Sequence, residues 1–144
     1  MKISAIILSA GNSTRYLSSK PKVFHELSGQ KLIDFNISLL NKYKEIKSCH
    51  IITNTALKEN FINLGYKNIS IQSPINGTGG AIAQFVSKNN IKADYYLICL
   101  GDTPIFNKKT IDALIKKTKN QKLDINVLGQ NLDNPFGYGR LIIE

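Results

Sequence analysis

A glycine-containing, cationic segment follows the first apolar stretch of the chain. Residues 6–22 read Ile-Ile-Leu-Ser-Ala-Gly-Asn-Ser-Thr-Arg-Tyr-Leu-Ser-Ser-Lys-Pro-Lys, so an apolar run leads to Gly11, Arg15 and Lys22. Backbone N–H groups of such a loop can face a polyphosphate, and the two cationic side chains add fixed positive charge. The plainer alternatives are a surface lysine and a glycine that serves only the turn. The segment predicts a site for a nucleoside triphosphate.

A carboxylate follows another strongly apolar stretch. Gly101 and Asp102 come directly after residues 95–100, which read Tyr-Tyr-Leu-Ile-Cys-Leu. A carboxylate at the end of a buried strand is well placed to hold Mg²⁺, which takes one or two protein carboxylates and completes its shell with phosphate oxygens and water. Because a helical pattern follows shortly, Asp102 could equally be a helix N-cap. The residue types alone favour neither interpretation.

Two more polar segments lie after a predicted strand. Gln72 carries a carboxamide that can both donate and accept hydrogen bonds, which suits the edge of a pyrimidine base. Residues 77–80 read Gly-Thr-Gly-Gly at the start of a helical pattern, where a backbone can approach a ligand closely. A polar strand end and a flexible helix start are the plainer interpretations.

Strand-like and helix-like periodicity alternate along the chain, which predicts right-handed βαβ units in one α/β domain, residues 1–144. The predicted strands span residues 3–8, 48–53, 68–72, 95–100, 124–128 and, cut short, 141–144. The predicted helices span residues 31–43, 56–64, 78–88 and 108–119. The continuously apolar strand 95–100 is expected to be buried on both faces of a mostly parallel sheet. In such a sheet the polar segments described above meet at the carboxyl ends of the strands.

Composition and charge argue against nucleic acid and membrane as partners and against secretion. The net charge of +9 comes mostly from dispersed lysines, and only Arg15 and Arg140 are arginines, so we expect no nucleic-acid partner. The sequence contains no run of the about 18–20 apolar residues that a membrane span requires. The start of the chain does not resemble a secretory signal. Cys49 and Cys99 lack metal-ligand spacing, so we expect free thiols in a cytoplasmic protein.

The quoted motifs together resemble a known family. Residues 8–15 and the stretch Pro-Lys-Val-Phe-His-Glu-Leu-Ser-Gly at 21–29 are similar to the sugar-1-phosphate nucleotidyltransferases. The similarity is strongest to the uridyltransferase domain of the bacterial N-acetylglucosamine-1-phosphate uridyltransferases. It continues through Gln72, residues 77–79, residues 101–104 and the Pro-x-Gly-Tyr-Gly-Arg segment at 135–140, and so covers nearly the whole chain in order. The resemblance implies a three-layer, Rossmann-like fold with helices on both faces of the sheet.

The resemblance implies a role for each matched residue. Arg15 and Lys22 would neutralise the triphosphate and the departing pyrophosphate, and Asp102 would bind Mg²⁺. Gln72 would contact uracil, and Gly139 would contact the acetamido sugar. The other implied nucleotide-binding residues are Leu8, Ser9, Ala10, Gly11, Gly77, Thr78, Leu100 and Gly101. The implied reaction transfers UMP from UTP to a sugar 1-phosphate such as N-acetylglucosamine 1-phosphate, and it yields a UDP-sugar and pyrophosphate.

The chain also departs from this family. Ser13 stands where glycine is usual, Gly80 replaces a common histidine, and Leu100 replaces a common tyrosine. The family's domain continues past Arg140 with acceptor contacts and a second Mg²⁺ ligand, and the hexapeptide repeats of an acetyltransferase β-helix domain are absent here. We therefore expect the nucleotide-binding portion, with self-association or a second chain supplying the rest. The alternatives are a non-catalytic nucleotide-binding fragment and a transferase that uses CTP or another phosphorylated acceptor.

Overall fold

The computed structural model describes residues 1–11, 18–105 and 107–142. They divide into two compact units, Met1–Phe106 and Asn107–Glu144, and each is described by itself. No helix within the described part of the chain is both long and apolar enough to cross a membrane.

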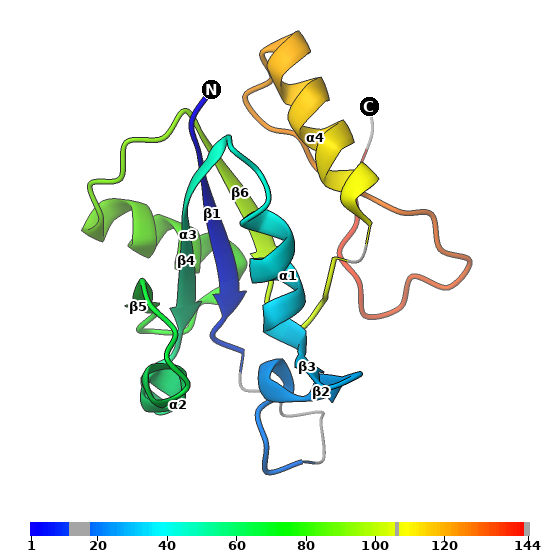
Figure 1. The fold of residues 1–144 in the computed structure, drawn as a ribbon. Helices are drawn as coiled ribbons and strands as arrows, with labels where there is room; N and C mark the ends of the chain where they lie inside the picture. Colours follow the sequence, from blue (N-terminus) through cyan, green and yellow to red (C-terminus); the bar gives the residue numbers. More distant parts are fainter. Residues whose placement is uncertain (12–17, 106, 143–144) are drawn as a thin grey trace. The chain divides into compact units, whose positions relative to one another are not determined.

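A run of apolar and small residues forms the central strand of the first unit. β1 (Ile3–Ser9) is buried along its whole length, and it pairs in parallel with β4 (Ile46–Thr53) and with β6 (Tyr95–Leu100). β5 (Ile69–Ile71) adds in parallel to β4, so the strand order is β5-β4-β1-β6 (Figure 1). A central parallel strand is covered on both faces, which explains why β1 shows no regular alternation of polar residues.

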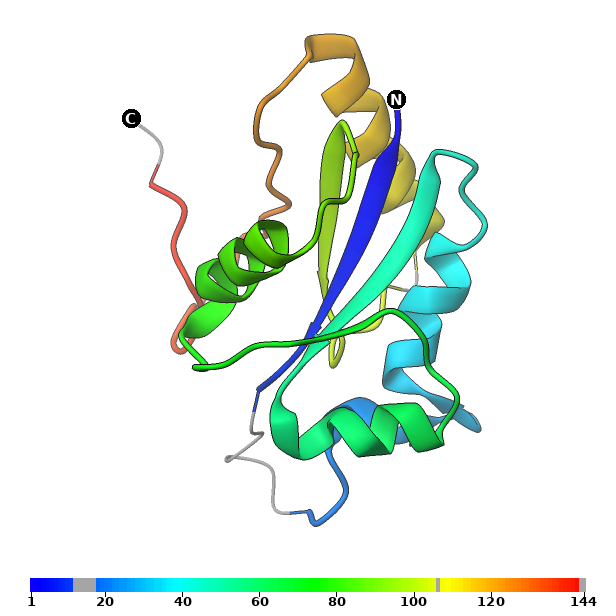
Figure 2. The same cartoon turned by 90° about the vertical axis from the view of Figure 1, so that its left-hand side faces the viewer.

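The two faces of this sheet are covered by different helices, seen on opposite sides of the strands in Figure 2. Ala5 and Ile7 of β1 point to the face where α1 (Leu32–Leu40) and α2 (Lys58–Asn63) pack. Ile6 and Leu8 point to the opposite face, which α3 (Gly77–Lys88) covers. Because side chains alternate along a strand, one continuous apolar sequence supplies both cores. The predicted three-layer α/β fold is confirmed.

Short elements connect β1 to α1. A 3-10 turn, η1 (Lys22–Phe24), begins directly after Pro21, and its Val23 and Phe24 are buried. β2 (Glu26–Leu27) and β3 (Gln30–Lys31) then form a small antiparallel hairpin. Its turn places Ser28 and Gly29 at positive φ, 52° and 76°, a combination typical of type I′ turns.

The remaining boundaries lie close to those predicted. A 3-10 turn, η2 (Thr55–Leu57), leads into α2, so the predicted helix 56–64 is real but begins irregularly. The second unit contains α4 (Lys108–Gln121), which begins after Asn107, whose side chain accepts a hydrogen bond from the Lys109 N–H. α4 ends at Lys122, which has a left-handed backbone conformation with φ 50°.

Three predictions about strands differ from the structure. β6 is not buried on both faces, because it is the last strand of the sheet and α3 packs over β1 and β4; Ile98 and Leu100 are 43% and 49% exposed. Residues 124–128 form no strand, since no other strand in their unit pairs with them, and Asn126 instead donates hydrogen bonds to the Leu114 carbonyl and Thr118 hydroxyl of α4. Leu141 and Ile142 are likewise not in a strand, and residues 143–144 lie outside the described part.

Candidate functional site

The order of the strands predicts where a ligand binds. From β1 the chain moves to β4 and β5 on one side, and it then returns to β6 on the other side of β1. Ligands of open parallel sheets bind beyond the carboxyl ends of the strands, where the direction of strand succession reverses. That point lies between the ends of β1 and β6, which carry the predicted segments at Gly11 and Asp102.

The ends of these two strands approach each other closely. The Gly101 N–H donates a 2.8 Å hydrogen bond to the Leu8 carbonyl. A Cβ atom at position 101 would overlap the Ser9 hydroxyl and lie 3.3 Å from the Leu8 carbonyl oxygen. The Ser9 hydroxyl is buried and has no hydrogen-bond partner among the described residues. Close packing against β1 therefore favours glycine at 101, whereas its φ is not in the left-handed region.

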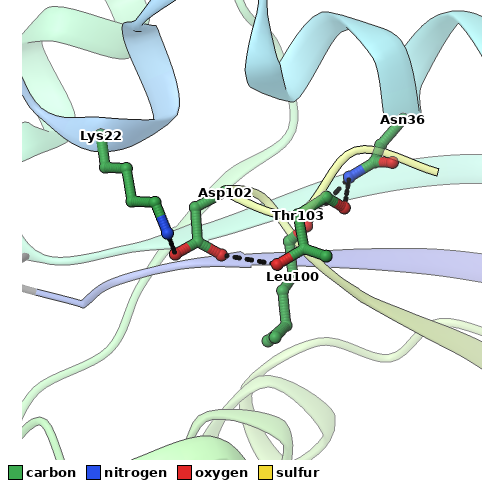
Figure 3. Close-up of polar contacts among 5 residues, drawn as sticks. All are labelled: Lys22, Asn36, Leu100, Asp102 and Thr103. Atoms are coloured by element: carbon green, nitrogen blue, oxygen red, sulfur yellow. Dashed lines mark hydrogen bonds and ion pairs between the residues drawn. The ribbon is translucent and has the colours of Figure 1, made fainter. Parts of the chain in front are cut away.

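The structure brings Lys22 and Asp102 together from positions 80 residues apart (Figure 3). Lys22 Nζ lies 3.1 Å from Asp102 Oδ2, and both side chains remain more than one-third exposed, at 38% and 37%. The backbone that carries Lys22 is fixed by the buried Val23 and Phe24, and the Phe24 ring lies 4.7 Å from that of Phe61. An anchored backbone with an exposed ammonium group suits a lysine that must reach an anionic ligand.

The chemistry of Asp102 suits a hard divalent cation. Its Oδ1 accepts a 3.3 Å hydrogen bond from the Thr103 hydroxyl, so both carboxylate oxygens have one partner each and keep further acceptor capacity. Within residues 1–11, 18–105 and 107–142, no group of three or more His, Cys, Asp or Glu residues is placed to hold a metal. A cation here would depend on one protein carboxylate, which is compatible with Mg²⁺ or Mn²⁺ bound largely through phosphate oxygens and water.

Sequence reasoning missed Asn36, a helix residue whose side chain contacts the backbone on both sides of Asp102. Its side chain is fully buried on α1, and its Nδ2 donates to the carbonyls of Leu100 at 2.9 Å and Thr103 at 3.2 Å (Figure 3). Its Oδ1 accepts from the Ile105 N–H at 2.7 Å. The available signal was a carboxamide at helical spacing from the buried Ile33 and Leu40, where an apolar residue is expected.

The loop after β5 carries the second polar cluster. Gln72 is 4% exposed, and its Nε2 donates to the Asn76 side chain at 3.1 Å and the Gly77 carbonyl at 3.0 Å. Gly77 has φ 84°, a conformation that favours glycine. From α3, Gln84 accepts from the Ser73 N–H at 3.0 Å and donates to the Pro74 carbonyl at 3.0 Å. The Gln72 N–H donates to the Thr53 carbonyl at 2.8 Å, so this loop continues from the carboxyl end of the same sheet.

The other predicted site residues fall into two groups. Leu8, Ser9, Ala10 and Gly11 lie at or just beyond the end of β1, Thr78 lies in the first turn of α3, and Leu100 ends β6. Gly139 lies in the second unit, Asn107–Glu144, and its role remains a prediction. Arg15 and Ser13 lie outside the described residues.

Neither cysteine is suited to nucleophilic chemistry. Both are free, and burial raises the pKa of Cys49 to about 11. Burial, with a smaller contribution from the neighbouring Cys49, raises the pKa of Cys99 to about 12. A reactive cysteine needs its thiolate form near neutral pH, so these side chains serve as small core residues.

Residues 5–142 match the family described as "MobA-like NTP transferase domain". The chain is 34% identical over 145 residues to the bifunctional protein GlmU of Alkaliphilus metalliredigens, an alignment that covers 99% of this chain and 31% of that protein. The chain thus spans about a third of the length of the curated relatives it matches.

Solved structures share the fold at low sequence identity. One is a putative glucose-1-phosphate thymidylyltransferase from Bacillus anthracis, with TM-score 0.70, 19% identity, and coverage of 83% of this chain and 51% of that chain. Another is Rv0371c from Mycobacterium tuberculosis H37Rv in complex with manganese, with TM-score 0.60, 13% identity, and coverage of 81% and 59%. Fold, strand order and the family match over almost the entire chain agree, and the chain belongs to the MobA-like NTP transferase domain family.

Proposed function

We propose that this protein transfers a nucleoside monophosphate from UTP to a sugar 1-phosphate, with N-acetylglucosamine 1-phosphate as the first acceptor to test. The observation that carries the proposal is the Lys22–Asp102 pair at the switch point between β1 and β6. There, a lysine on an anchored backbone and a carboxylate with free acceptor capacity occupy the edge where such sheets bind nucleotides. The similarity to the bifunctional protein GlmU supports uridylyl transfer in particular.

The reaction requires no covalent intermediate on the protein. An oxygen of the sugar 1-phosphate attacks the α-phosphorus of UTP, a new P–O bond forms, the bond to the β-phosphate oxygen breaks, and pyrophosphate leaves. Both reactants are anions, so the barrier is lowered chiefly by orienting them and by neutralising the charge on the leaving group. Lys22 would neutralise part of that charge, and Arg15 is proposed for the same role.

A divalent cation would be held by Asp102. When bound, Mg²⁺ would neutralise phosphate charge and orient the triphosphate. Lys22 and a cation at Asp102 would repel each other, so we expect Lys22 to turn from the carboxylate toward the phosphates when the nucleotide binds. The backbone at Leu8–Gly11 and at Leu100–Gly101 would lie along the uridine, and Gly139 is proposed to contact the acceptor sugar.

The hydrogen bonds of Gln72 leave its side-chain oxygen available to a pyrimidine base. The Gly77 carbonyl can only accept, so Nε2 of Gln72 must be the atom that faces it. With Nε2 donating to Gly77 and Asn76, the Oε1 atom has no partner among the described residues. This free acceptor can take a hydrogen bond from the N3–H of uracil or from the 4-amino group of cytosine. The contact therefore suits a pyrimidine base, and the preference for UTP rests on the similarity to the bifunctional protein GlmU.

Pyrophosphate release from UTP, N-acetylglucosamine 1-phosphate and Mg²⁺ tests this proposal directly. We expect release that requires acceptor and metal together, is faster with UTP than with CTP, and is lost in Asp102→Ala. A preference for CTP would redirect the proposal to a cytidylyltransferase. If every acceptor gives no release, the proposed transfer is wrong for this chain.

A second candidate function is nucleotide binding without turnover, and it is favoured by one observation. Among the described residues, Asp102 belongs to no group of three or more His, Cys, Asp or Glu residues that could hold a metal ion. Saturable UTP binding without release of pyrophosphate would support this candidate. If addition of a second chain, or a concentration at which the protein self-associates, then restores release, the missing groups are supplied by a partner.

A further inference from the structure

We infer that Asn36 is a positioning residue, which sets the place of the Asp102 carboxylate through the backbone of the loop after β6. The inference rests on the proposed function in that it assigns Asp102 to a metal–nucleotide complex. The argument for Asn36 itself begins with its burial. A carboxamide at 0% exposure is costly unless its polar atoms are paired. Here both Nδ2 hydrogens and Oδ1 have partners, and all three partners are backbone groups at the end of β6 or in the loop that follows it.

Those three partners bracket Asp102. The Leu100 carbonyl lies two residues before it, the Thr103 carbonyl one residue after it, and the Ile105 N–H three residues after it. Leu100 is the last residue of β6, and its carbonyl also accepts a 3.4 Å hydrogen bond from the Thr103 N–H. Thr103 and Ile105 lie outside both strand and helix, so their backbone groups need partners from elsewhere. Asn36 contacts the strand end and both of these residues from α1, and it thereby holds the backbone on both sides of the carboxylate.

The side chain of Asp102 is held far less firmly than its backbone. Its contacts with Lys22 and Thr103 involve exposed or partly exposed groups, and ion pairs of this exposure contribute little to structure. A carboxylate that must exchange a lysine for a metal needs such loose contacts. The position of the carboxylate before a metal binds is then set by the loop backbone that Asn36 holds (Figure 3).

Few other residues could do this at position 36. Two N–H donors and one acceptor at this reach describe a carboxamide, and glutamine would add a methylene to a closely packed interior. Leucine has similar bulk but satisfies none of the three groups. Serine keeps one hydroxyl that can donate or accept. The effect of Asn36→Ser on metal-dependent UTP binding should therefore lie between that of the wild-type protein and that of Asn36→Leu.

The test measures binding rather than turnover. UTP is titrated calorimetrically with Mg²⁺ and again with a chelator, and the ratio of the two affinities gives the gain due to metal. Removing groups that orient a metal ligand typically costs 10–100-fold in metal affinity. We therefore expect Asn36→Leu to reduce the metal gain by about tenfold or more, with a smaller change in UTP affinity without metal, and Asn36→Ser to fall in between.

Asn89→Ala is the matched control. Like that of Asn36, its carboxamide donates to a carbonyl, that of Phe85 at 2.8 Å, but it is only partly buried and lies at the far end of α3. We expect this variant to keep the wild-type metal gain. Should Asn36→Leu not fold, Asn36→Ser decides the matter, with amide hydrogen exchange at Ile105 confirming that the loop contact is weakened.

The outcomes separate the two proposals. A folded Asn36 variant with faster exchange at Ile105 and an unchanged metal gain would overturn the positioning role. A reduced metal gain in a protein that releases no pyrophosphate would refute the transfer reaction and leave the positioning role standing. A wild-type protein whose affinity for UTP does not respond to Mg²⁺ would overturn both.

Discussion

The loop after β6 and the loop after β5 are each held by one carboxamide on a helix, yet the two carboxamides differ in burial. Asn36 is completely buried, and it holds the loop of Asp102 through two carbonyls and one N–H. Gln84 holds residues 73–76 in a similar manner, but its hydrogen bonds lie at the surface, and its Nε2 also donates to the Asn76 side chain at 3.3 Å. Asn36 and Gln84 thus make a similar pattern of donated and accepted hydrogen bonds, but Asn36 is buried and the hydrogen bonds of Gln84 are exposed to solvent.

This difference matches what each loop is proposed to bind. Stabilising phosphate charge requires groups fixed in advance, because reorganisation during the reaction raises the barrier. Reading a base through Gln72 tolerates a network in which several side chains can exchange partners. The buried carboxamide of Asn36 therefore supports the loop that carries Asp102, and the more exposed carboxamide of Gln84 supports the loop that is proposed to contact the base.

The largest effect should come from the charged contact of the loop after β6. Lys22→Ala removes the ammonium group that faces Asp102 and, by proposal, the triphosphate. We expect turnover in pyrophosphate release to fall about 10²–10³-fold, the scale for loss of one preorganised electrostatic group.

Lys20→Ala is the matched control for that variant. Lys20 has the same charge, lies two residues away and pairs at 3.4 Å with Glu26, and both of these side chains are about half exposed. Its removal should leave turnover within about twofold, since exposed pairs of this kind contribute little. Equal losses in the two variants would mean that only general positive charge matters.

A smaller effect, on the free energy of unfolding, should distinguish Asn36 from Gln84. Asn36→Leu removes three part-buried hydrogen bonds to the backbone around Asp102, and we expect it to lower the free energy of unfolding by about 2–4 kcal/mol. Gln84→Ala exposes its partners to water and should cost about 1 kcal/mol or less. Urea unfolding of both variants measures the difference, and equal costs would remove the contrast in burial on which the comparison rests.

The smallest effects should come from one glycine near each loop. Gly101→Ala places a methyl group against the Ser9 hydroxyl and the Leu8 carbonyl, so we expect a loss of about 1–3 kcal/mol in the free energy of unfolding. Gly79→Ala lies in the first turn of α3 with nothing within 4 Å of its Cβ, and it should stabilise by about 0.5–1 kcal/mol. A tolerated alanine at 101 would mean that the ends of β1 and β6 can separate freely.

Much of the fold could be predicted because periodicity reports burial. The runs at 3–8 and 95–100 predicted β1 and β6 almost to the residue. The same signal failed at 124–128, because an apolar pattern shows that a segment can form a strand and not that a partner is present. It also failed for the burial of β6, whose position at the sheet edge depends on strand order.

Residue type and a strand end together indicated Asp102, and the structure places Lys22 beside it, while the roles of both remain predictions. Asn36 could not be predicted, since a carboxamide in a helix gives no indication of the loop that it will contact 64 to 69 residues later. The hairpin at Ser28 and Gly29 carried a local signal that strand periodicity does not capture. The proposed role of Arg15 remains a prediction.

Amide hydrogen exchange with and without UTP and Mg²⁺ tests the central claim most directly, because it locates the nucleotide without assuming a reaction. The account predicts slower exchange at residues 8–11 and 100–105, with residues 72–78 protected more weakly. Residues 46–50, at the opposite end of β4, should not change. Protection confined to other surfaces, or none at saturating nucleotide, would contradict a site at the carboxyl ends of β1 and β6.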